Sequence, residues 1–128
     1  MGRAKIFRQI FGLRGFPQSL KLAIKGILYL FLFHRNMRVI FITGILAFLL
    51  GVYFKLNGVE LVALCITISL VFMAEIFNTA IELIIDMFTD KFHIKIKLVK
   101  DIAAGVVLLT CLNAVAVGCI LFFRKLFR

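Results

Sequence analysis

Acidic residues and cysteines are both scarce in this chain. Only 6 of the 128 residues are Asp or Glu, against 16 Lys and Arg, and 3 are Cys. Cys65, Cys111 and Cys119 all lie within apolar segments, where an odd number of thiols argues against a disulfide framework or a zinc site and indicates small packing residues. We expect no cleavable signal peptide, because the basic N-terminus lacks an apolar stretch that ends in a small-residue cleavage site.

Apolar residues, in contrast, dominate the composition. They make up 63% of the chain, and the mean hydropathy of +1.11 excludes a soluble domain of ordinary composition. The basic residues cluster at the ends of apolar segments, which favours anionic lipid head groups over nucleic acid as their partner. The sequence therefore predicts one small helical membrane domain over residues 1–128, with so little interior that we expect it to form an oligomer.

Three apolar segments predict an all-α membrane protein with three transmembrane helices. The predicted spans cover about residues 39–54, 61–87 and 102–123. Residues 3–33 precede them and predict amphipathic helices on the membrane surface. The second of these would run over 20–33, with Ser19 as its N-cap and an apolar part too short to cross a bilayer.

The distribution of basic residues predicts the orientation. Residues 1–38 hold eight Lys and Arg, and the predicted loop over 88–100 holds four more. The predicted turn over 55–60 holds one, and the C-terminal tail holds three. The positive-inside rule therefore places the N-terminus and the 88–100 loop in the cytoplasm.

A polar stripe runs along the second half of the second predicted span. At about 100° per residue, Glu75, Thr79, Glu82 and Asp86 lie within roughly 40° of one line, with Asn78 at its edge. A carboxylate at membrane depth is costly and marks a functional site by default. Taken alone, however, Asp86 is equally well explained as a solvated helix end, and Asp101 as the N-cap of the third span.

The depth of the stripe suggests which molecules can reach it. Glu75 lies about 21 Å from the outer end of the span at Leu61, and Glu82 about 31 Å, at 1.5 Å per residue. A lipid hydroxyl can thus approach Glu75 from the bilayer. A soluble phosphate donor and its metal ion can approach Glu82 and Asp86 from the cytosol.

The sequence resembles the small bacterial diacylglycerol kinases and undecaprenol kinases, a family of integral membrane lipid kinases. The residues that carry the resemblance are Glu75-Ile76-Phe77-Asn78-Thr79-Ala80-Ile81-Glu82, Asp86, Lys100-Asp101-Ile102-Ala103-Ala104-Gly105, and Ala23-Ile24-Lys25-Gly26 with Arg38. It covers roughly residues 19–122. The Asn78-Thr79 pair and the Arg35-Asn36-x-Arg38 segment resemble the undecaprenol kinase branch.

The resemblance implies a homotrimer in the bacterial cytoplasmic membrane, with active sites shared between subunits. It also implies transfer of the γ-phosphate of ATP to a lipid alcohol, either undecaprenol or diacylglycerol, with Mg²⁺ as cofactor. Glu75 would be the catalytic base, and Asn78 and Lys25 would join it in binding the lipid. The residues implied for nucleotide binding are Glu82, Asp86, Lys100, Asp101 and Arg14, of which Glu82 would also hold the metal ion.

One position departs from the family pattern. Four residues before the arginine that matches Arg38, the family has a glutamate that helps to bind metal, and this chain has His34. Imidazole is a poor ligand for Mg²⁺, which prefers oxygen, and suits Mn²⁺ better. The sequence therefore predicts a metal site that is altered at His34.

Two other classes of function stay open at this stage. A small carboxylate-dependent transporter or channel would need access to its key acid from both sides of the membrane, whereas this stripe opens to one side. A catalytically impaired homologue with a role in assembly would not need the stripe. The residues alone also leave the choice between the two lipid alcohols open.

Overall fold

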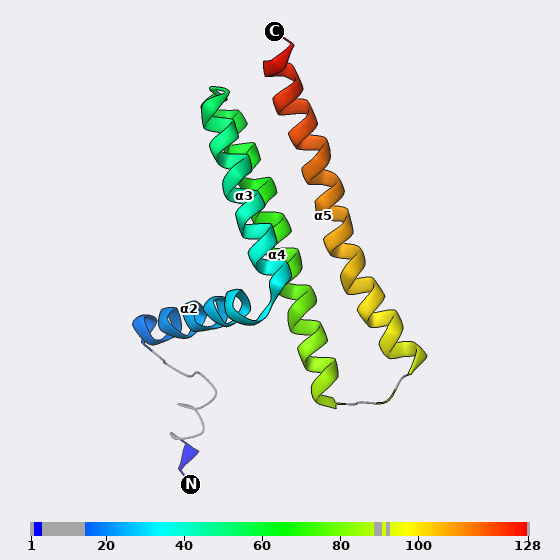
Figure 1. The fold of residues 1–128 in the computed structure, drawn as a ribbon. Helices are drawn as coiled ribbons and strands as arrows, with labels where there is room; N and C mark the ends of the chain where they lie inside the picture. The colour runs from blue at the N-terminus through cyan, green and yellow to red at the C-terminus, as the bar shows by residue number, and fades with distance from the viewer. Residues whose placement is uncertain (1, 4–14, 89–90, 92, 128) are drawn as a thin grey trace. The chain divides into compact units, whose positions relative to one another are not determined.

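The computed structural model describes residues 2–3, 15–88, 91 and 93–127 (Figure 1). Its helices are, in chain order, α2 (Phe16–Phe33), α3 (Arg35–Tyr53), α4 (Gly58–Phe88) and α5 (Ile94–Leu126). The chain divides into two compact units, Met1–His34 and Arg35–Arg128. The expectation of an all-α protein is thus confirmed for the described residues.

Helix α2 begins earlier than the sequence predicted. Its N-cap is Gly15, and Pro17 lies in the first turn, where a proline costs nothing because its missing N–H would have no helical partner. Ser19 therefore lies inside the helix, and its prediction as the N-cap was wrong. The first of the two predicted surface helices, which the sequence places over residues 3–13, lies outside the described residues apart from Arg3, and so does Arg14.

Helix α2 also bears on the number of spans. It has 18 residues and a mean hydropathy of 1.3, so that α2, α3, α4 and α5 are all long and apolar enough to cross a membrane. The predicted set of three spans is a subset of these four.

Helix α3 packs closely against α4 through two small residues. A Cβ atom on Gly44 would lie 2.9 Å from Cγ2 of Ile68, and one on Gly51 would lie 2.9 Å from Cδ2 of Leu64. Small residues at such a contact let two helix backbones approach each other, as is typical of helix packing in membranes. Helix α3 also starts at Arg35, four residues before the predicted span over 39–54, so only His34 separates it from α2.

A reciprocal cap fixes the start of α4. The backbone N–H of Glu60 donates to Oδ1 of Asn57 at 2.9 Å, and the backbone N–H of Asn57 donates to Oε2 of Glu60 at 2.9 Å. This is a capping box, in which two otherwise unpaired backbone donors at a helix start are satisfied by side chains. The preceding turn reverses the chain at Lys55, whose φ is 57°.

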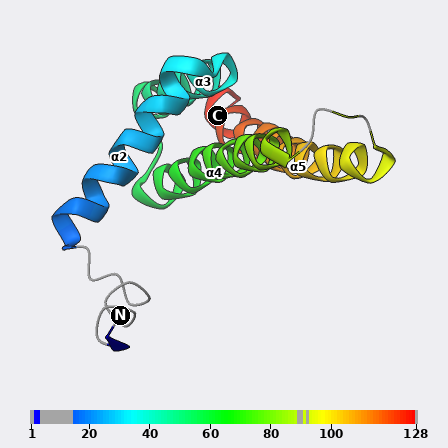
Figure 2. The same cartoon turned by 90° about the horizontal axis from the view of Figure 1, so that it is seen from below.

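Helices α4 and α5 lie side by side and antiparallel (Figures 1 and 2). An ion pair joins the two helices near each end. At one end Lys125 Nζ lies 3.7 Å from Glu60 Oε2, and at the other Lys100 Nζ lies 3.1 Å from Asp86 Oδ1. Glu60 and Asp86 are 26 residues apart, or about 39 Å along the helix. Two polar layers at that separation match a bilayer together with its head-group regions.

The predicted loop over 88–100 is mostly helix. Helix α5 begins at Ile94, and His93 caps it by accepting a hydrogen bond from the N–H of Lys95 at 3.1 Å. The lysines that suggested a loop occupy the first turns of a helix that extends beyond its apolar run. Asp101 consequently lies inside α5, and the reading of Asp101 as an N-cap was wrong.

A cluster of buried apolar side chains lies at the capped end of α4. Leu56, Leu64 and Leu121 are buried there, and four half-buried side chains pack against them, namely Leu61, Ile68, Val117 and Phe122. This cluster anchors the three helices at the end away from the polar stripe.

The orientation can be tested with reporters. We expect a reporter after Asn57 on the extracytoplasmic side and one after Lys95 on the cytoplasmic side, because twelve of the basic residues fall on the latter. An N-terminal reporter should share the side of the Lys95 reporter if α2 lies on the surface. It should report the opposite side if α2 is a fourth span. Reversed labelling of the first two reporters would contradict the predicted access of a cytosolic nucleotide to Glu82.

Candidate functional site

Helix α4 buries three of its polar side chains. Thr67, Glu75 and Thr79 are its buried polar residues, with 6%, 6% and 2% of their surface exposed. The Thr67 hydroxyl is satisfied within its own helix, because it donates to the carbonyl of Ala63 at 2.8 Å. Intramembrane polar groups that face the bundle are typical of functional positions.

Glu75 is the deepest carboxylate of the stripe. It follows Glu60 by 15 residues and precedes Asp86 by 11, which places it about 22 Å and about 16 Å from these two residues along the helix. Both of those residues mark polar ends of the α4–α5 pair. Glu75 is therefore buried at membrane depth, nearer to the end that carries the rest of the stripe.

Asn78 and Glu82 form a pair one turn further along α4. The Nδ2 amide of Asn78 donates to Oε1 of Glu82 at 3.4 Å. Because an ionised carboxylate only accepts hydrogen bonds, the amide nitrogen must face Glu82 and the amide oxygen must point away. Oδ1 of Asn78 is buried and has no hydrogen-bond partner within the described residues. An unsatisfied buried acceptor costs about 1–3 kcal/mol, so this oxygen is suited to receive a donor from a ligand.

Charged side chains surround the end of α4 and the start of α5. Asp86 pairs with Lys100, and Lys97 Nζ lies 2.6 Å from Asp101 Oδ2. These side chains are 40–64% exposed, and exposed ion pairs contribute only about 0–1 kcal/mol to stability. A phosphate ligand can therefore exchange for one of these carboxylates at little cost to the fold.

The remaining predicted site residues lie in the other compact unit. Lys25 is exposed on α2, and His34 caps the end of that helix with its backbone N–H donating to the carbonyl of Leu30 at 2.9 Å. The structure thus brings Asn78, Glu82, Asp86 and Lys100 together on two packed helices. Lys25 and His34 are placed only within their own unit.

The donor atoms of α4 fit Mg²⁺ in one particular mode of binding. The described residues contain no group of three or more His, Cys, Asp and Glu side chains that could hold a metal ion by themselves. Mg²⁺ commonly binds one or two carboxylates together with substrate phosphates and waters. Glu82, with Asp86 one turn away, offers that set of oxygen ligands.

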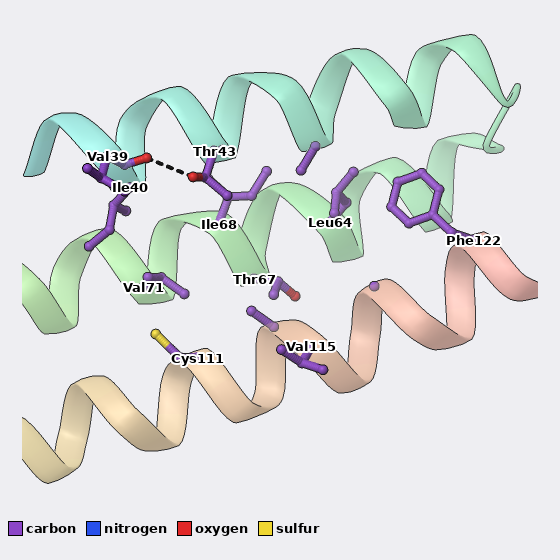
Figure 3. Close-up of a pocket in the computed structure, with 14 residues that line it drawn as sticks. Val39, Ile40, Thr43, Leu64, Thr67, Ile68, Val71, Cys111, Val115 and Phe122 are labelled. Atoms are coloured by element: carbon purple, nitrogen blue, oxygen red, sulfur yellow. Dashed lines mark hydrogen bonds between the residues drawn. The ribbon is translucent and has the colours of Figure 1, made fainter. Parts of the chain in front are cut away.

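Sequence reasoning missed an apolar groove between α3, α4 and α5 (Figure 3). Its volume is about 360 Å³, and small residues from two helices create it, Gly44 and Ala47 on α3 and Ala114 and Gly118 on α5. The Thr43 hydroxyl in its wall donates to the carbonyl of Val39 at 2.8 Å, so the lining offers no unpaired hydroxyl there. A signal for the groove existed in these small residues, but only their juxtaposition in the structure reveals it.

The groove lies in line with the polar stripe. Its lining includes Leu64, Thr67, Ile68 and Val71 on α4, and Val71 is one helical turn from Glu75. A molecule with a polar end at Glu75 can therefore extend an apolar chain along α4 into the groove.

These features define a class, namely an all-helical protein whose described helices are long and apolar enough to cross a membrane, with carboxylates gathered toward one end of the α4–α5 pair. The family model described as prokaryotic diacylglycerol kinase matches residues 21–122, and the chain belongs to that family. The resemblance found in the sequence is thus confirmed.

Two curated relatives support the same assignment. The chain is 35% identical over 101 residues to a diacylglycerol kinase of Synechocystis sp., a match that covers 78% of this chain and 58% of the relative. It is 36% identical over 76 residues to an undecaprenol kinase of Bacillus subtilis, a match that covers 59% of this chain and 62% of the relative. The chain thus spans about three fifths of the length of each relative.

Proposed function

We propose that this protein is a membrane lipid kinase that transfers the γ-phosphate of ATP to a lipid alcohol at the cytoplasmic face of the bacterial cytoplasmic membrane. The observation that carries the proposal is the buried Glu75, in line with Asn78 and Glu82 on a helix long enough to cross a bilayer. Family membership and the names of both relatives support a kinase over a transporter or an assembly protein.

Glu75 acts as the general base in this proposal. Its carboxylate accepts the proton of the lipid hydroxyl while the hydroxyl oxygen forms a bond to the γ-phosphorus. The bond between that phosphorus and the β–γ bridging oxygen breaks, and its electron pair leaves with ADP. Burial of Glu75 keeps water from competing for the phosphoryl group.

Asn78 positions the acceptor. Its unpaired Oδ1 is an acceptor atom, so it is suited to a lipid hydroxyl and not to a phosphate oxygen, which also only accepts. The amide is held in that orientation by its hydrogen bond to Glu82. Asn78 therefore aims the hydroxyl until Glu75 takes its proton.

The cytoplasmic part of the stripe holds the nucleotide. Glu82 and Asp86 lie about 10 Å and about 16 Å beyond Glu75 along α4, so ATP can extend along the helix with its terminal phosphate nearest Glu75. Glu82 would hold Mg²⁺, and the ion would supply neutralisation of the phosphate charge. Lys100 donates to phosphate oxygens. The family resemblance assigns Asp101 to nucleotide binding as well, and it implies the same role for Arg14.

The assay that tests the activity uses purified protein with γ-labelled ATP and total bacterial membrane lipid. We expect the label to move into a chloroform-soluble lipid phosphate in a Mg²⁺-dependent reaction. Label that stays in ATP, together with ion or solute flux in proteoliposomes, would contradict the kinase and favour the transporter. Label that stays in ATP without any flux would favour an assembly role.

We infer further that undecaprenol is preferred to diacylglycerol. The groove begins one turn from Glu75 and continues along α4 as far as Leu64, about 16 Å beyond Glu75. A single long isoprenoid chain fits a narrow path between three helices, whereas diacylglycerol brings two acyl chains to one glycerol. The Asn78-Thr79 pair, which resembles the undecaprenol kinase branch of the family, favours the same lipid.

A groove-filling variant tests this preference. A Cβ on Gly118 would meet nothing within 4 Å, so Gly118→Leu projects into the groove without a backbone clash. Displacing two chain methylenes costs about 1.6 kcal/mol, so KM for undecaprenol should rise about 15-fold. Cys119→Leu, on an exposed neighbour that does not line the groove, is the matched control and should leave KM unchanged. Stronger phosphorylation of diacylglycerol in a mixed micelle, or equal KM values for the two variants, would overturn the inference.

A further inference from the structure

Thr79 is the most deeply buried polar side chain of helix α4. Only 2% of its surface is exposed, less than for Glu75 or Thr67. It follows Glu75 by four residues and precedes Glu82 by three, so it lies about 6 Å beyond the first and about 4.5 Å short of the second along the helix axis. Thr79 thus lies on the polar stripe between the proposed base and the proposed metal ligand.

The Thr79 hydroxyl differs from the hydroxyls of the other three described threonines. Thr43, Thr67 and Thr110 each donate to a backbone carbonyl of their own helix at 2.8 Å, a local bond that satisfies a hydroxyl inside a helix. For Thr79, no hydrogen bond of the side chain is found among the described residues. A buried hydroxyl without a partner costs about 1–3 kcal/mol, which favours a ligand that accepts a hydrogen bond there.

The stripe around Thr79 is rich in acceptors and poor in donors. Residues 75–82, all of them described, carry four polar side chains, Glu75, Asn78, Thr79 and Glu82. An ionised carboxylate only accepts, and the amide nitrogen of Asn78 is directed at Oε1 of Glu82. The Thr79 hydroxyl is therefore the donor in this stretch that is not already directed at a carboxylate.

A phosphoryl group in transfer needs donors where the stripe offers carboxylates. Its equatorial oxygens carry negative charge and only accept hydrogen bonds. Donors that are fixed in place beside such oxygens, in a site that excludes water, lower the energy of the transition state. Thr79 meets both conditions, because it is buried and its position is fixed on a helix.

We propose that the Thr79 hydroxyl donates a hydrogen bond to an equatorial oxygen of the phosphoryl group as this group passes from ATP to the lipid alcohol. This assignment rests on the kinase activity proposed above. The hydroxyl keeps its proton throughout and forms no covalent bond, so the bonds that form and break at phosphorus are those already described. Thr79 is a catalytic residue in the sense that it contacts the reacting group.

Asn78 and Thr79 divide the two reactants between them. At about 100° per residue, Asn78 projects about 60° to one side of Glu75, and Thr79 projects about 40° to the other. Oδ1 of Asn78 is an acceptor and suits the lipid hydroxyl, whereas the Thr79 hydroxyl is a donor and suits the phosphoryl oxygen. Glu75, which takes the proton of the lipid hydroxyl, projects between them.

The test compares two substitutions of Thr79 in the full-length protein, with labelled ATP and bacterial membrane lipid as substrates. Thr79→Val keeps the size and branching of the side chain but removes the hydroxyl. It should lower kcat by about 10²- to 10³-fold, the usual effect of losing one such donor. KM for ATP should change little, because the contact forms only during transfer. Thr79→Ser keeps the hydroxyl and should retain most of the native kcat.

Thr110→Val is the matched control. It makes the same change on α5, where the hydroxyl donates to the carbonyl of Val107 at 2.8 Å and where Thr110 does not line the groove. Its kcat should stay close to that of the native chain. Near-native kcat for Thr79→Val would overturn the proposal. A loss in Thr79→Ser as large as in Thr79→Val would also overturn it, because the packing of the side chain and not its hydroxyl would then be responsible.

Inhibition by ADP with aluminium fluoride gives a second measurement, because the fluoride complex mimics a phosphoryl group in transfer. The inhibition constant should rise in Thr79→Val by about the factor by which kcat falls, since a transition-state contact stabilises both. Equal inhibition of the native chain and Thr79→Val would contradict the contact. A native chain that transfers no label would refute the kinase activity and this inference together, whereas an active native chain with an equally active Thr79→Val would refute this inference alone.

Discussion

Replacing Glu75 by glutamine is expected to lower the rate of phosphoryl transfer by about 10² to 10⁴, the usual contribution of a general base. The amide keeps the size of the side chain and its place on the buried face of α4, but it cannot accept the proton of the lipid hydroxyl. Because the loss falls on the chemical step, kcat should drop while KM for ATP changes little. Turnover of purified protein with saturating lipid and ATP measures the effect.

Glu60→Gln provides a matched control for this change. It makes the same carboxylate-to-amide substitution on the same helix, about 22 Å from Glu75. Glutamine also serves at this position of a capping box, so the start of α4 should keep its cap. Near-native turnover of Glu75→Gln, or an equal loss in Glu60→Gln, would remove Glu75 from the role of base.

The helices were predictable from the sequence, but their ends were not. The apolar runs at 39–54, 61–87 and 102–123 each lie largely inside a helix of the structure. Hydropathy marks where hydrocarbon ends, whereas a helix ends only where its backbone is capped. Helix α5 thus carries Lys95, Lys97 and Lys100 beyond its apolar run as far as the cap at His93.

The polar stripe could be predicted because it depends on one helix alone. The phase of Glu75, Asn78 and Glu82 follows from the period of 3.6 residues, and so does the Asn78–Glu82 hydrogen bond between residues four apart. The groove could not be predicted in this way, since it requires the register of α3, α4 and α5 together.

Replacing Glu82 by glutamine should have the second large effect, on the concentration of Mg²⁺ that activity requires. Losing a residue that only hydrogen-bonds to a metal ligand typically costs about 10- to 100-fold in metal affinity. Glu82→Gln should cost more, because it removes a carboxylate that would bind the metal directly. The variant also disturbs the orientation of Asn78, so KM for the lipid should rise with the concentration of Mg²⁺ that is required. Titration of activity with Mg²⁺ measures the first effect, and titration with lipid measures the second.

His34 is where this chain departs from the family, and it should modulate the same titration. The family resemblance implies a carboxylate at this position, so in the native chain Glu82 and the ATP phosphates carry most of the metal binding. Mn²⁺ should therefore replace Mg²⁺ unusually well, because imidazole suits it better. His34→Glu should lower the required Mg²⁺ concentration and remove the advantage of Mn²⁺. If the native chain is catalytically impaired, this substitution should be needed for any turnover. If the native chain and His34→Glu show the same dependence of activity on Mg²⁺ concentration, His34 lies outside the metal site. If Glu82→Gln shows the same dependence as the native chain, Glu82 is not a metal ligand.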